Sequence, residues 1–248
     1  MLSLWAKTSG TWINVALVLL GTISGLLLRG RLPNRMQDVI TQAVGLITIF
    51  IGVQMARPLV EVDAGAIAGV IVGLVALVTG GLLGEWWQIE QRLVTIGDNL
   101  KTQFGGSGQF TEGFVAASLL FCVGPMTILG SLNNGLSGDG TILIIKGTMD
   151  GLVSIALTGS YGMGVGFSVL PVVIYQGGLS LLAGLLSSGI GDPTSSASVL
   201  LVTGVGGVII LGLGLNLLKV TTIRVASFLP ALLLTPLLYK LCQILSLG

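Results

Sequence analysis

Eight apolar runs, each long enough to cross a bilayer as a helix, dominate this sequence of 248 residues. A helix needs about 20 mostly apolar residues to span roughly 30 Å of hydrocarbon. Only helices and closed β-barrels satisfy their backbone groups in lipid, and continuous rather than alternating apolar runs exclude a barrel. The sequence therefore predicts an all-α polytopic membrane protein with about eight transmembrane helices (seven to eight). The runs are Trp12–Leu28, Val39–Ala56, Ala64–Gly84, Gly113–Leu132, Ile142–Thr158, Gly166–Leu186, Ser198–Leu218 and Val225–Leu245.

Composition agrees with a membrane protein and excludes several functions. Only 8% of the residues are charged and none is histidine, against roughly 25% charged residues in a soluble domain. The net charge of +1 provides no basic patch for a nucleic acid. Cys122 and Cys242 lie in apolar runs without a CxxC or Cys/His cluster, so we expect no metal and no cofactor. No nucleophile stands beside a base, which argues against an enzyme.

The distribution of lysine and arginine predicts the orientation. With the N-terminus outside, seven cationic residues fall on the inner side and four on the outer side, which favours both termini outside. The inner residues are Arg29, Arg31, Arg35, Arg92, Lys101, Lys219 and Arg224, and the outer ones are Lys7, Arg57, Lys146 and Lys240. This prediction requires the Gly-rich piece Thr158–Pro171 to be a tight turn between two helices. If that piece is a re-entrant element, the C-terminal half changes sides.

A segment of different character follows the third run. Apolar residues recur there at steps of three or four between Trp86 and Phe104, with charged residues interspersed. That spacing predicts an amphipathic helix on the inner membrane face. A "GGSG" hinge follows, and Thr111 could cap the next helix. We therefore divide the chain into a three-helix unit plus the surface helix (1–104) and a five-helix unit (109–248), within a single integrated membrane domain.

Short matches suggest an internal repeat. "GVQM" at 52–55 in the second run resembles "GLNL" at 214–217 in the seventh, and "GTIS" at 21–24 in the first resembles "GGLS" at 177–180 in the sixth. Helices 1–3 would then recur as helices 6–8, and an odd offset makes the repeats antiparallel, as in many secondary transporters. The alternative is coincidence in a Gly-rich apolar sequence.

Glycines spaced four residues apart recur in the apolar runs. Gly21-x3-Gly25 and Gly80-x3-Gly84 allow close helix approach. We expect packing within the subunit, with a homo-oligomer as the lesser alternative.

Prolines interrupt the fourth and sixth runs. Pro125 lacks an amide hydrogen and its ring clashes with the Phe121 carbonyl, so the fourth helix should kink after Gly124. Pro171 should break the sixth helix likewise. Exposed backbone in a membrane is tolerated where it is buried in protein or lines water, so two broken helices near amide side chains favour a transport site. The alternative is that the kinks serve packing alone.

Polar side chains within the apolar runs are the candidate site residues. Asp150 is the costliest of them, and Lys146 precedes it by one helical turn. Asp150 could therefore be a paired residue at the outer interface, or a carboxylate that binds a cation or proton. For the amides the alternative is a simple hydrogen bond between helices; further intramembrane amides include Asn14, Gln42 and Asn134. We expect the lining of a solute or ion site to comprise Gln54, Gly124, Pro125, Asn133, Asp150, Tyr175, Gln176 and Asn216.

Several longer strings resemble a known family. "FTEGFVAASLLFCVGPMTILGSLNNGLSGD", "KGTMDG" and "VVIYQGGLSLLAG" are similar to the bacterial membrane family catalogued as domain of unknown function 554, the YqgA/YdfK type. The resemblance covers nearly the whole chain and implies a multi-pass protein of the bacterial cytoplasmic (inner) membrane. It implies no activity. Related sequences often have a small residue in place of Pro125, so the predicted kink belongs to this chain rather than to the family.

These observations favour a transporter or channel for a small solute or ion. Its site would lie between helices 4, 5 and 6 and the amide-bearing ends of helices 2 and 7. The alternative is a noncatalytic membrane scaffold or regulator, in which the polar residues serve packing. The expected partners are the lipid bilayer and an unidentified solute or ion.

Overall fold

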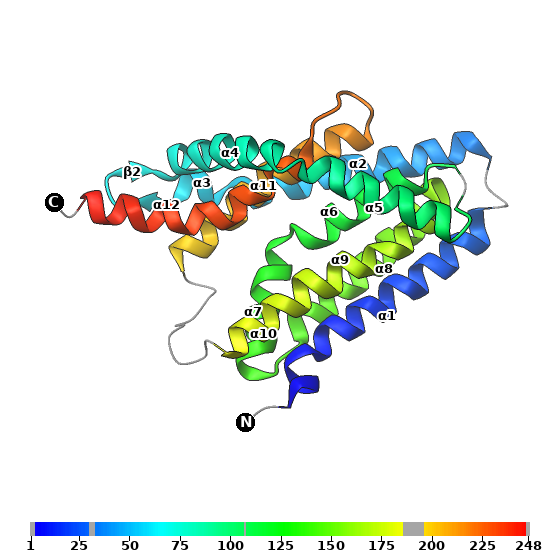
Figure 1. Ribbon diagram of the computed structural model, residues 1–248, viewed down its shortest axis with the longest axis horizontal. Helices are drawn as coiled ribbons and strands as arrows, with labels where there is room; N and C mark the ends of the chain where they lie inside the picture. The colour runs from blue at the N-terminus through cyan, green and yellow to red at the C-terminus, as the bar shows by residue number, and fades with distance from the viewer. Residues whose placement is uncertain (1–2, 30–32, 107, 186–195, 247–248) are drawn as a thin grey trace. The chain divides into compact units, whose positions relative to one another are not determined.

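A computed structural model describes residues 3–29, 33–106, 108–185 and 196–246, which are almost entirely helical (Figure 1). Among them, seven helices are long and apolar enough to cross a membrane, or eight if the bent pair α6 and α7 forms one span, as predicted. The elements are α1 (Leu4–Arg29), α2 (Asn34–Ala56), α3 (Pro58–Glu61), β1 (Asp63–Ala64), β2 (Ile67–Ala68), α4 (Gly69–Trp86), α5 (Ile89–Gln103), α6 (Phe110–Cys122), α7 (Pro125–Ser137), α8 (Thr141–Tyr161), η1 (Met163–Ser168), α9 (Val169–Val172), η2 (Val173–Gly177), α10 (Gly178–Leu185), α11 (Ala197–Leu217), η4 (Val225–Phe228) and α12 (Pro230–Ser246).

The helices form two compact units that are interleaved in the sequence. Unit 1 contains residues 1–44 and 94–193, and unit 2 contains 45–93 and 194–248. This division differs from the one predicted at residues 104–109, because unit 1 includes both sides of that hinge. Helices α2 and α5 each contribute to both units.

Unit 1 is built on a close parallel pair, α1 and α8, which lie side by side in Figure 1. Gly10 lies against Leu143, and Gly25 against Thr158, so residue numbers rise together along the two helices. A Cβ atom at Gly21 would stand 2.1 Å from the carbonyl oxygen of Gly151. The Gly21-x3-Gly25 step therefore packs α1 inside the subunit, as predicted, and places the polar side chains of α1 directly against α8.

The sixth span, Met163–Ala183, runs antiparallel to α1. A Cβ atom at Gly166 would lie 2.8 Å from Thr22, and one at Gly177 would lie 3.8 Å from Thr11. Residue numbers therefore fall along the sixth span as they rise along α1. The chain enters this span through Gly162 (φ +84°), which is the tight turn predicted within 158–171.

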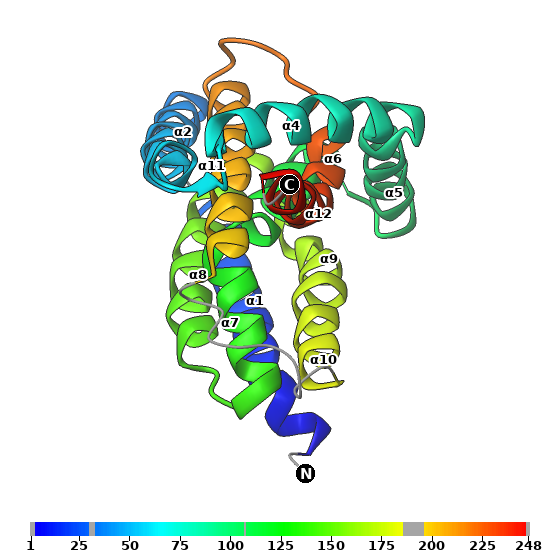
Figure 2. The same cartoon turned by 90° about the vertical axis from the view of Figure 1, so that its left-hand side faces the viewer.

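Pro171 does not break the sixth span, so that prediction is wrong. A 3-10 turn (η1), α9, the π-helix η2 and α10 follow one another without a gap, and Figure 2 shows α9 and α10 as one rod. Pro171 lies in the four-residue helix α9, between a 3-10 turn and a π-helix, and the span continues through these changes of helix type.

The break at Gly124-Pro125 is present. Helix α6 ends at Cys122, α7 begins at Pro125, and the pair is bent by 59°. Beyond the bend, α7 packs on α10, where a Cβ at Gly135 would lie 1.9 Å from the Ser180 carbonyl oxygen. Helices α1 and α8 are parallel, so an odd number of membrane crossings separates them. If α2 and α4 each cross once, α6 and α7 together form the third crossing.

Unit 2 contains two antiparallel helix pairs. Gly45 of α2 packs against Gly214 of α11, and Gly52 against Gly207, each through a backbone carbonyl. In the second pair, Gly80 of α4 lies against Ala231 of α12, and Gly84 lies against the Ser227 carbonyl of η4. The Gly80-x3-Gly84 step thus also packs within the subunit.

A small hairpin precedes α4. In it, Asp63 pairs with Ala68 and Ala64 with Ile67. The third helix therefore begins at Gly69 rather than at Ala64 as predicted.

Helix α5 confirms the predicted amphipathic segment. Trp86, which precedes it, is 78% exposed, as expected for an anchor at the membrane surface. In unit 1, Thr111 donates to Oδ1 of Asp98 at 2.6 Å, so it ties α6 to α5 instead of capping α6. In unit 2, Oε2 of Glu90 accepts from the Ala226 amide at 2.7 Å, and burial raises the pKa of Glu90.

Candidate functional site

Five polar side chains meet in the interior of unit 1 and form what we call the polar cluster. Thr11 and Asn14 come from α1, Lys146 and Asp150 from α8, and Gln176 from η2. None of the five is more than 8% exposed. The cluster therefore lies between three membrane-spanning segments.

Asn14 links the members of the cluster. Its Nδ2 donates to Oδ2 of Asp150 at 3.1 Å and to Oε1 of Gln176 at 3.1 Å. Gln176 Nε2 donates to the Thr11 hydroxyl at 3.4 Å. Lys146 forms an ion pair with the same oxygen of Asp150, and its ammonium lies 5.9 Å from the centroid of the Phe121 ring. The Asp150 carboxylate thus accepts from a neutral amide of a neighbouring helix and pairs with a lysine of its own helix.

Buried hydroxyl groups extend the polar surface away from the cluster. Ser118 satisfies its hydroxyl by donating to the Phe114 carbonyl at 2.6 Å, the usual arrangement for serine in a helix. Seven other buried polar atoms have no hydrogen-bond partner among the residues that the structure describes, although each such atom costs about 1–3 kcal/mol. They are Oδ1 of Asn14 and the hydroxyls of Thr22, Ser131, Ser154, Thr158, Ser168 and Ser180. Unit 1 therefore contains more hydrogen-bonding capacity than its own packing uses.

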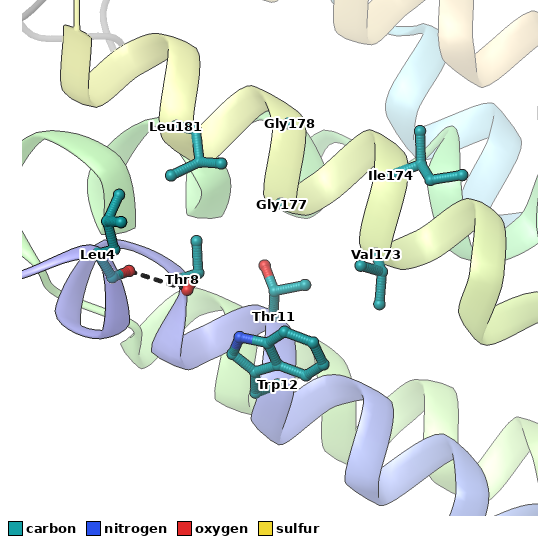
Figure 3. Close-up of a pocket in the computed structure, with 9 residues that line it drawn as sticks. All are labelled: Leu4, Thr8, Thr11, Trp12, Val173, Ile174, Gly177, Gly178 and Leu181. Carbon is teal, nitrogen blue, oxygen red and sulfur yellow. Dashed lines mark hydrogen bonds between the residues drawn. The ribbon is translucent and has the colours of Figure 1, made fainter.

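A groove of about 420 Å³ adjoins the cluster between α1 and the sixth span (Figure 3). Thr11 points from α1 towards Gly177 across this groove. Because the Thr11 hydroxyl also accepts from Gln176, one residue belongs to both the groove wall and the cluster. The groove is lined by Leu4, Thr8, Thr11, Trp12, Val173, Ile174, Gly177, Gly178 and Leu181.

The broken helix lies next to the cluster. Pro125 leaves the Phe121 carbonyl without its helical partner, and the Thr127 hydroxyl donates to that carbonyl at 3.0 Å. The ring of Phe121 is the one beneath the Lys146 ammonium. Thr127 therefore stabilises the break at the point where α6 meets the ion pair.

Replacing Thr127 with valine should destabilise the protein by about 1–3 kcal/mol, because the buried Phe121 carbonyl would lose its donor. Thermal unfolding in detergent measures this loss. Thr148 provides the control, since its hydroxyl also donates to a carbonyl but is exposed. A Thr127→Val variant as stable as Thr148→Val would contradict the assigned role.

The structure brings together only some of the predicted site residues. Asp150 and Gln176 lie in the cluster, and Tyr175 is the half-buried neighbour of Gln176 in η2. Gly124 caps α7 at the break. The ion pair of Asp150 with Lys146, one of the two possibilities predicted for Asp150, is formed, and both residues are buried in unit 1.

Asn133 and Asn134 have different surroundings. The predicted residue, Asn133, has a half-buried side chain. Asn134 is fully buried, and its amide donates to the Ala6 carbonyl at 3.0 Å and accepts from the Gly10 amide at 3.1 Å. These are the backbone groups that a regular helix pairs with each other. Asn134 therefore fixes the first turns of α1 against α7.

The other two predicted amides belong to unit 2. The Asn216 side chain accepts from the Ile223 amide at 2.8 Å and donates to the Ile223 carbonyl at 2.7 Å. Both of its polar atoms thus hold the loop that follows α11. Gln54 is exposed on α2.

Asn14, Thr11 and Lys146 are the cluster members outside the predicted set. Asn14 is an amide inside the first apolar run, and Thr11 stands three residues before it. For Lys146, the sequence indicates only a local ion pair with Asp150, four residues later. The spacing of Thr11 and Asn14 on one helix face was the available indication.

No group of three or more potential metal ligands of the His, Cys, Asp or Glu type occurs in the described part of the chain. The absence of a metal and of a cofactor stays a prediction.

Comparison with known proteins gives a family but no activity. The model of the family described as "Protein of unknown function (DUF554)" matches residues 9–240. The chain is 31% identical to "Uncharacterized membrane protein YdfK" of Bacillus subtilis (strain 168), covering 92% of this chain and 93% of that protein. It is 30% identical to "Uncharacterized protein YqgA" of Escherichia coli (strain K12), covering 91% and 93%. No solved structure matches it. The chain is a membrane protein and belongs to the DUF554 family.

Proposed function

We propose that this protein is a transporter or channel for a small polar solute or ion, and that the polar cluster is its binding site. The observation that carries the proposal is the buried Lys146–Asp150 pair, which Asn14 connects to Gln176 by donating to both Asp150 and Gln176. Ionisable groups inside a membrane protein are expensive and commonly mark substrate or ion pathways.

Packing alone is a weak explanation for such a cluster. A buried ion pair often contributes less stability than apolar side chains of similar volume, because desolvation offsets the attraction. Hydrogen bonds between membrane helices contribute only about 0.6 kcal/mol on average. Unpartnered Oδ1 of Asn14 provides an acceptor for a ligand. The groove is lined by Thr11, which accepts from Gln176 and so joins the groove to the cluster.

The helix packing supports the proposed inverted repeat of helices 1–3 and 6–8. Aligning Gly52 with Gly214 also aligns Gly45 with Gly207, and these four glycines pack as the pairs Gly45–Gly214 and Gly52–Gly207. A two-fold axis that relates α2 to α11 would exchange these two glycine pairs with each other. Within its own unit, every helix of the first set packs antiparallel to its counterpart. Inverted repeats of this kind are common in secondary transporters.

We place the protein in the bacterial inner membrane with both termini outside. Lys146 is buried in α8 rather than in an outer loop, so the predicted balance of inner to outer cations becomes seven to three. An even number of crossings, counting α6 and α7 as one, also puts the two termini on the same side. We further propose that the protein acts without catalysing a covalent reaction.

A ligand screen tests the proposed function. Purified protein would be heated with a panel of ions and small metabolites, and a ligand at about a hundred times its dissociation constant should stabilise the fold by about 2.7 kcal/mol. Gln176→Ala should abolish the stabilisation, because the cluster loses its link between α1 and the sixth span. Gln103→Ala, an exposed amide in α5, is the matched control.

Transport then distinguishes a carrier from a scaffold. A stabilising ligand should be taken up by proteoliposomes containing the wild-type protein and not by those containing Gln176→Ala. Binding without uptake would favour the scaffold alternative. Stabilisation that survives Gln176→Ala would place the ligand elsewhere.

A further inference from the structure

Three helices of unit 1 each direct a line of residues, four apart, towards a common interior. On α8 the line is Lys146, Asp150, Ser154 and Thr158; on α1 it includes Asn14, Val18 and Thr22; on the sixth span it is Ser168, Val172, Gln176 and Ser180. All of these residues are buried. Residues spaced by four share one helix face.

These lines divide the interior into three levels. The first is the level of Asn14, Asp150 and Gln176, which are joined by hydrogen bonds. One level further towards the Gly162 turn are Val18, Val172 and Ser154, which are fully buried. The third level contains Thr22, Thr158 and Ser168, whose hydroxyls have no partner among the described residues. We call this last group the hydroxyl ring.

Contacts across the helices show that Ser154 and Thr158 lie on the face of α8 that meets α1. A Cβ atom at Gly21 would lie 3.0 Å from Cβ of Ser154, and one at Gly25 would lie 2.7 Å from Cβ of Thr158. Thr22 faces the sixth span at Gly166. On α8, Ser154 is the polar side chain between Asp150 and Thr158, whereas α1 and the sixth span have valines in the corresponding positions of their lines.

We propose that Ser154 is the step through which protons pass between the hydroxyl ring and the Asp150 carboxylate, which makes the proton the coupling ion. This inference rests on the proposed transport function. A hydroxyl both donates and accepts, so Ser154 can take a proton on its oxygen from one side and release its own proton to the other. Adjacent positions of the line are about 5–6 Å apart at Cβ, a gap of the length that one water molecule can bridge.

The proton balance at Asp150 is simple. Uptake forms an O–H bond on the carboxylate and removes its negative charge, so the ion pair with Lys146 is lost and Lys146 keeps its charge. Release reverses both changes. Neither direction requires an oxidant, a reductant or a second reactant.

The other titratable groups near Asp150 are few. Lys146 contacts it from the same helix, Cys122 on α6 lies within electrostatic reach of both residues, and Tyr175 on η2 is near Cys122. Helix α1 presents the uncharged Asn14, and α7 contains no titratable side chain. A hydroxyl at position 154 is thus the polar connection from the cluster to the hydroxyl ring.

The test follows protonation of Asp150 directly and needs no substrate. The full-length protein in lipid nanodiscs is subjected to a pH jump, and the infrared band of the protonated carboxyl is recorded with time. The band is assigned by its loss in Asp150→Asn. Ser154→Ala should slow its appearance about tenfold or more without moving its equilibrium midpoint. Ser154→Thr should restore the rate because it restores the hydroxyl.

Ser118→Ala is the matched control, because Ser118 is a buried helical serine of unit 1 whose hydroxyl is already bonded. Its rate should equal that of the wild type. Equal rates in Ser154→Ala and Ser118→Ala would overturn the proposed path, as would an Asp150 band that does not titrate. If solute binding in the ligand screen persists in either case, the transport proposal stands and the proton path alone fails.

Discussion

Asp150→Asn should destabilise the protein by about 3–5 kcal/mol, since it leaves the buried Lys146 ammonium without its counter-charge. The side chain keeps its size, so packing changes little. The double variant Lys146→Met/Asp150→Asn should recover most of the loss, because it removes the orphaned charge. Thermal or denaturant unfolding of the wild type, both single variants and the double variant measures the coupling between the two residues.

The same four proteins separate stability from function. The double variant should be stable yet unable to couple solute movement to an ion, since the carboxylate is gone. The exposed pair Arg57 and Glu61, with the same spacing and side chains 65% and 60% exposed, is the control and should show coupling of about 0–1 kcal/mol. Comparable coupling energies for the two pairs would mean that the interior pair is solvated. Intact coupled uptake in Asp150→Asn would remove that carboxylate from the mechanism.

Gly21→Val should have the second large effect, a loss of about 3 kcal/mol or more. A Cβ atom at Gly21 would stand 2.1 Å from the Gly151 carbonyl oxygen, and backbone cannot move aside as a flexible side chain can. Such overpacking typically costs about 1–3 kcal/mol and occasionally more. Separating α1 from α8 would also pull Asn14 away from Asp150.

Gly178 provides the comparison, because a Cβ atom there meets nothing within 4 Å. Gly178→Val should therefore be tolerated in unfolding experiments. Solute-induced stabilisation should disappear in Gly21→Val; because Gly178 lines the groove, Gly178→Val is the control for stability alone. Equal tolerance of both substitutions would show that the α1–α8 contact is looser than the structure indicates.

The number of spans, the broken fourth helix and two cluster residues could be predicted from the sequence. A long apolar run or a proline affects the structure of its own segment, so the kink at Pro125 could be predicted from the neighbouring residues. Asp150 and Gln176 were identifiable because a polar group in hydrocarbon requires an explanation. These predictions depend on the type of residue and its immediate surroundings.

The remaining features depend on contacts that one-dimensional spacing does not contain. Asn14 bonds to Gln176, 162 residues away, and only the antiparallel packing of their helices brings them together. Asn216 is an amide inside an apolar run, as expected of a site residue, but its side chain bonds the backbone of Ile223, seven residues later. Pro171 resembles Pro125 in the sequence, yet the sixth span continues through Pro171 by changing its helix type on either side of α9.

The long separations within the polar cluster also determine the order of its assembly on the ribosome. Asn14 is among the first residues made, whereas its partners Asp150 and Gln176 follow 136 and 162 residues later. At about 5–20 residues per second, the interval before both partners exist is roughly 10–30 s. During that interval the first helix carries an amide whose native partners are still untranslated, so its final position in the membrane can be fixed only after the sixth span has been synthesised.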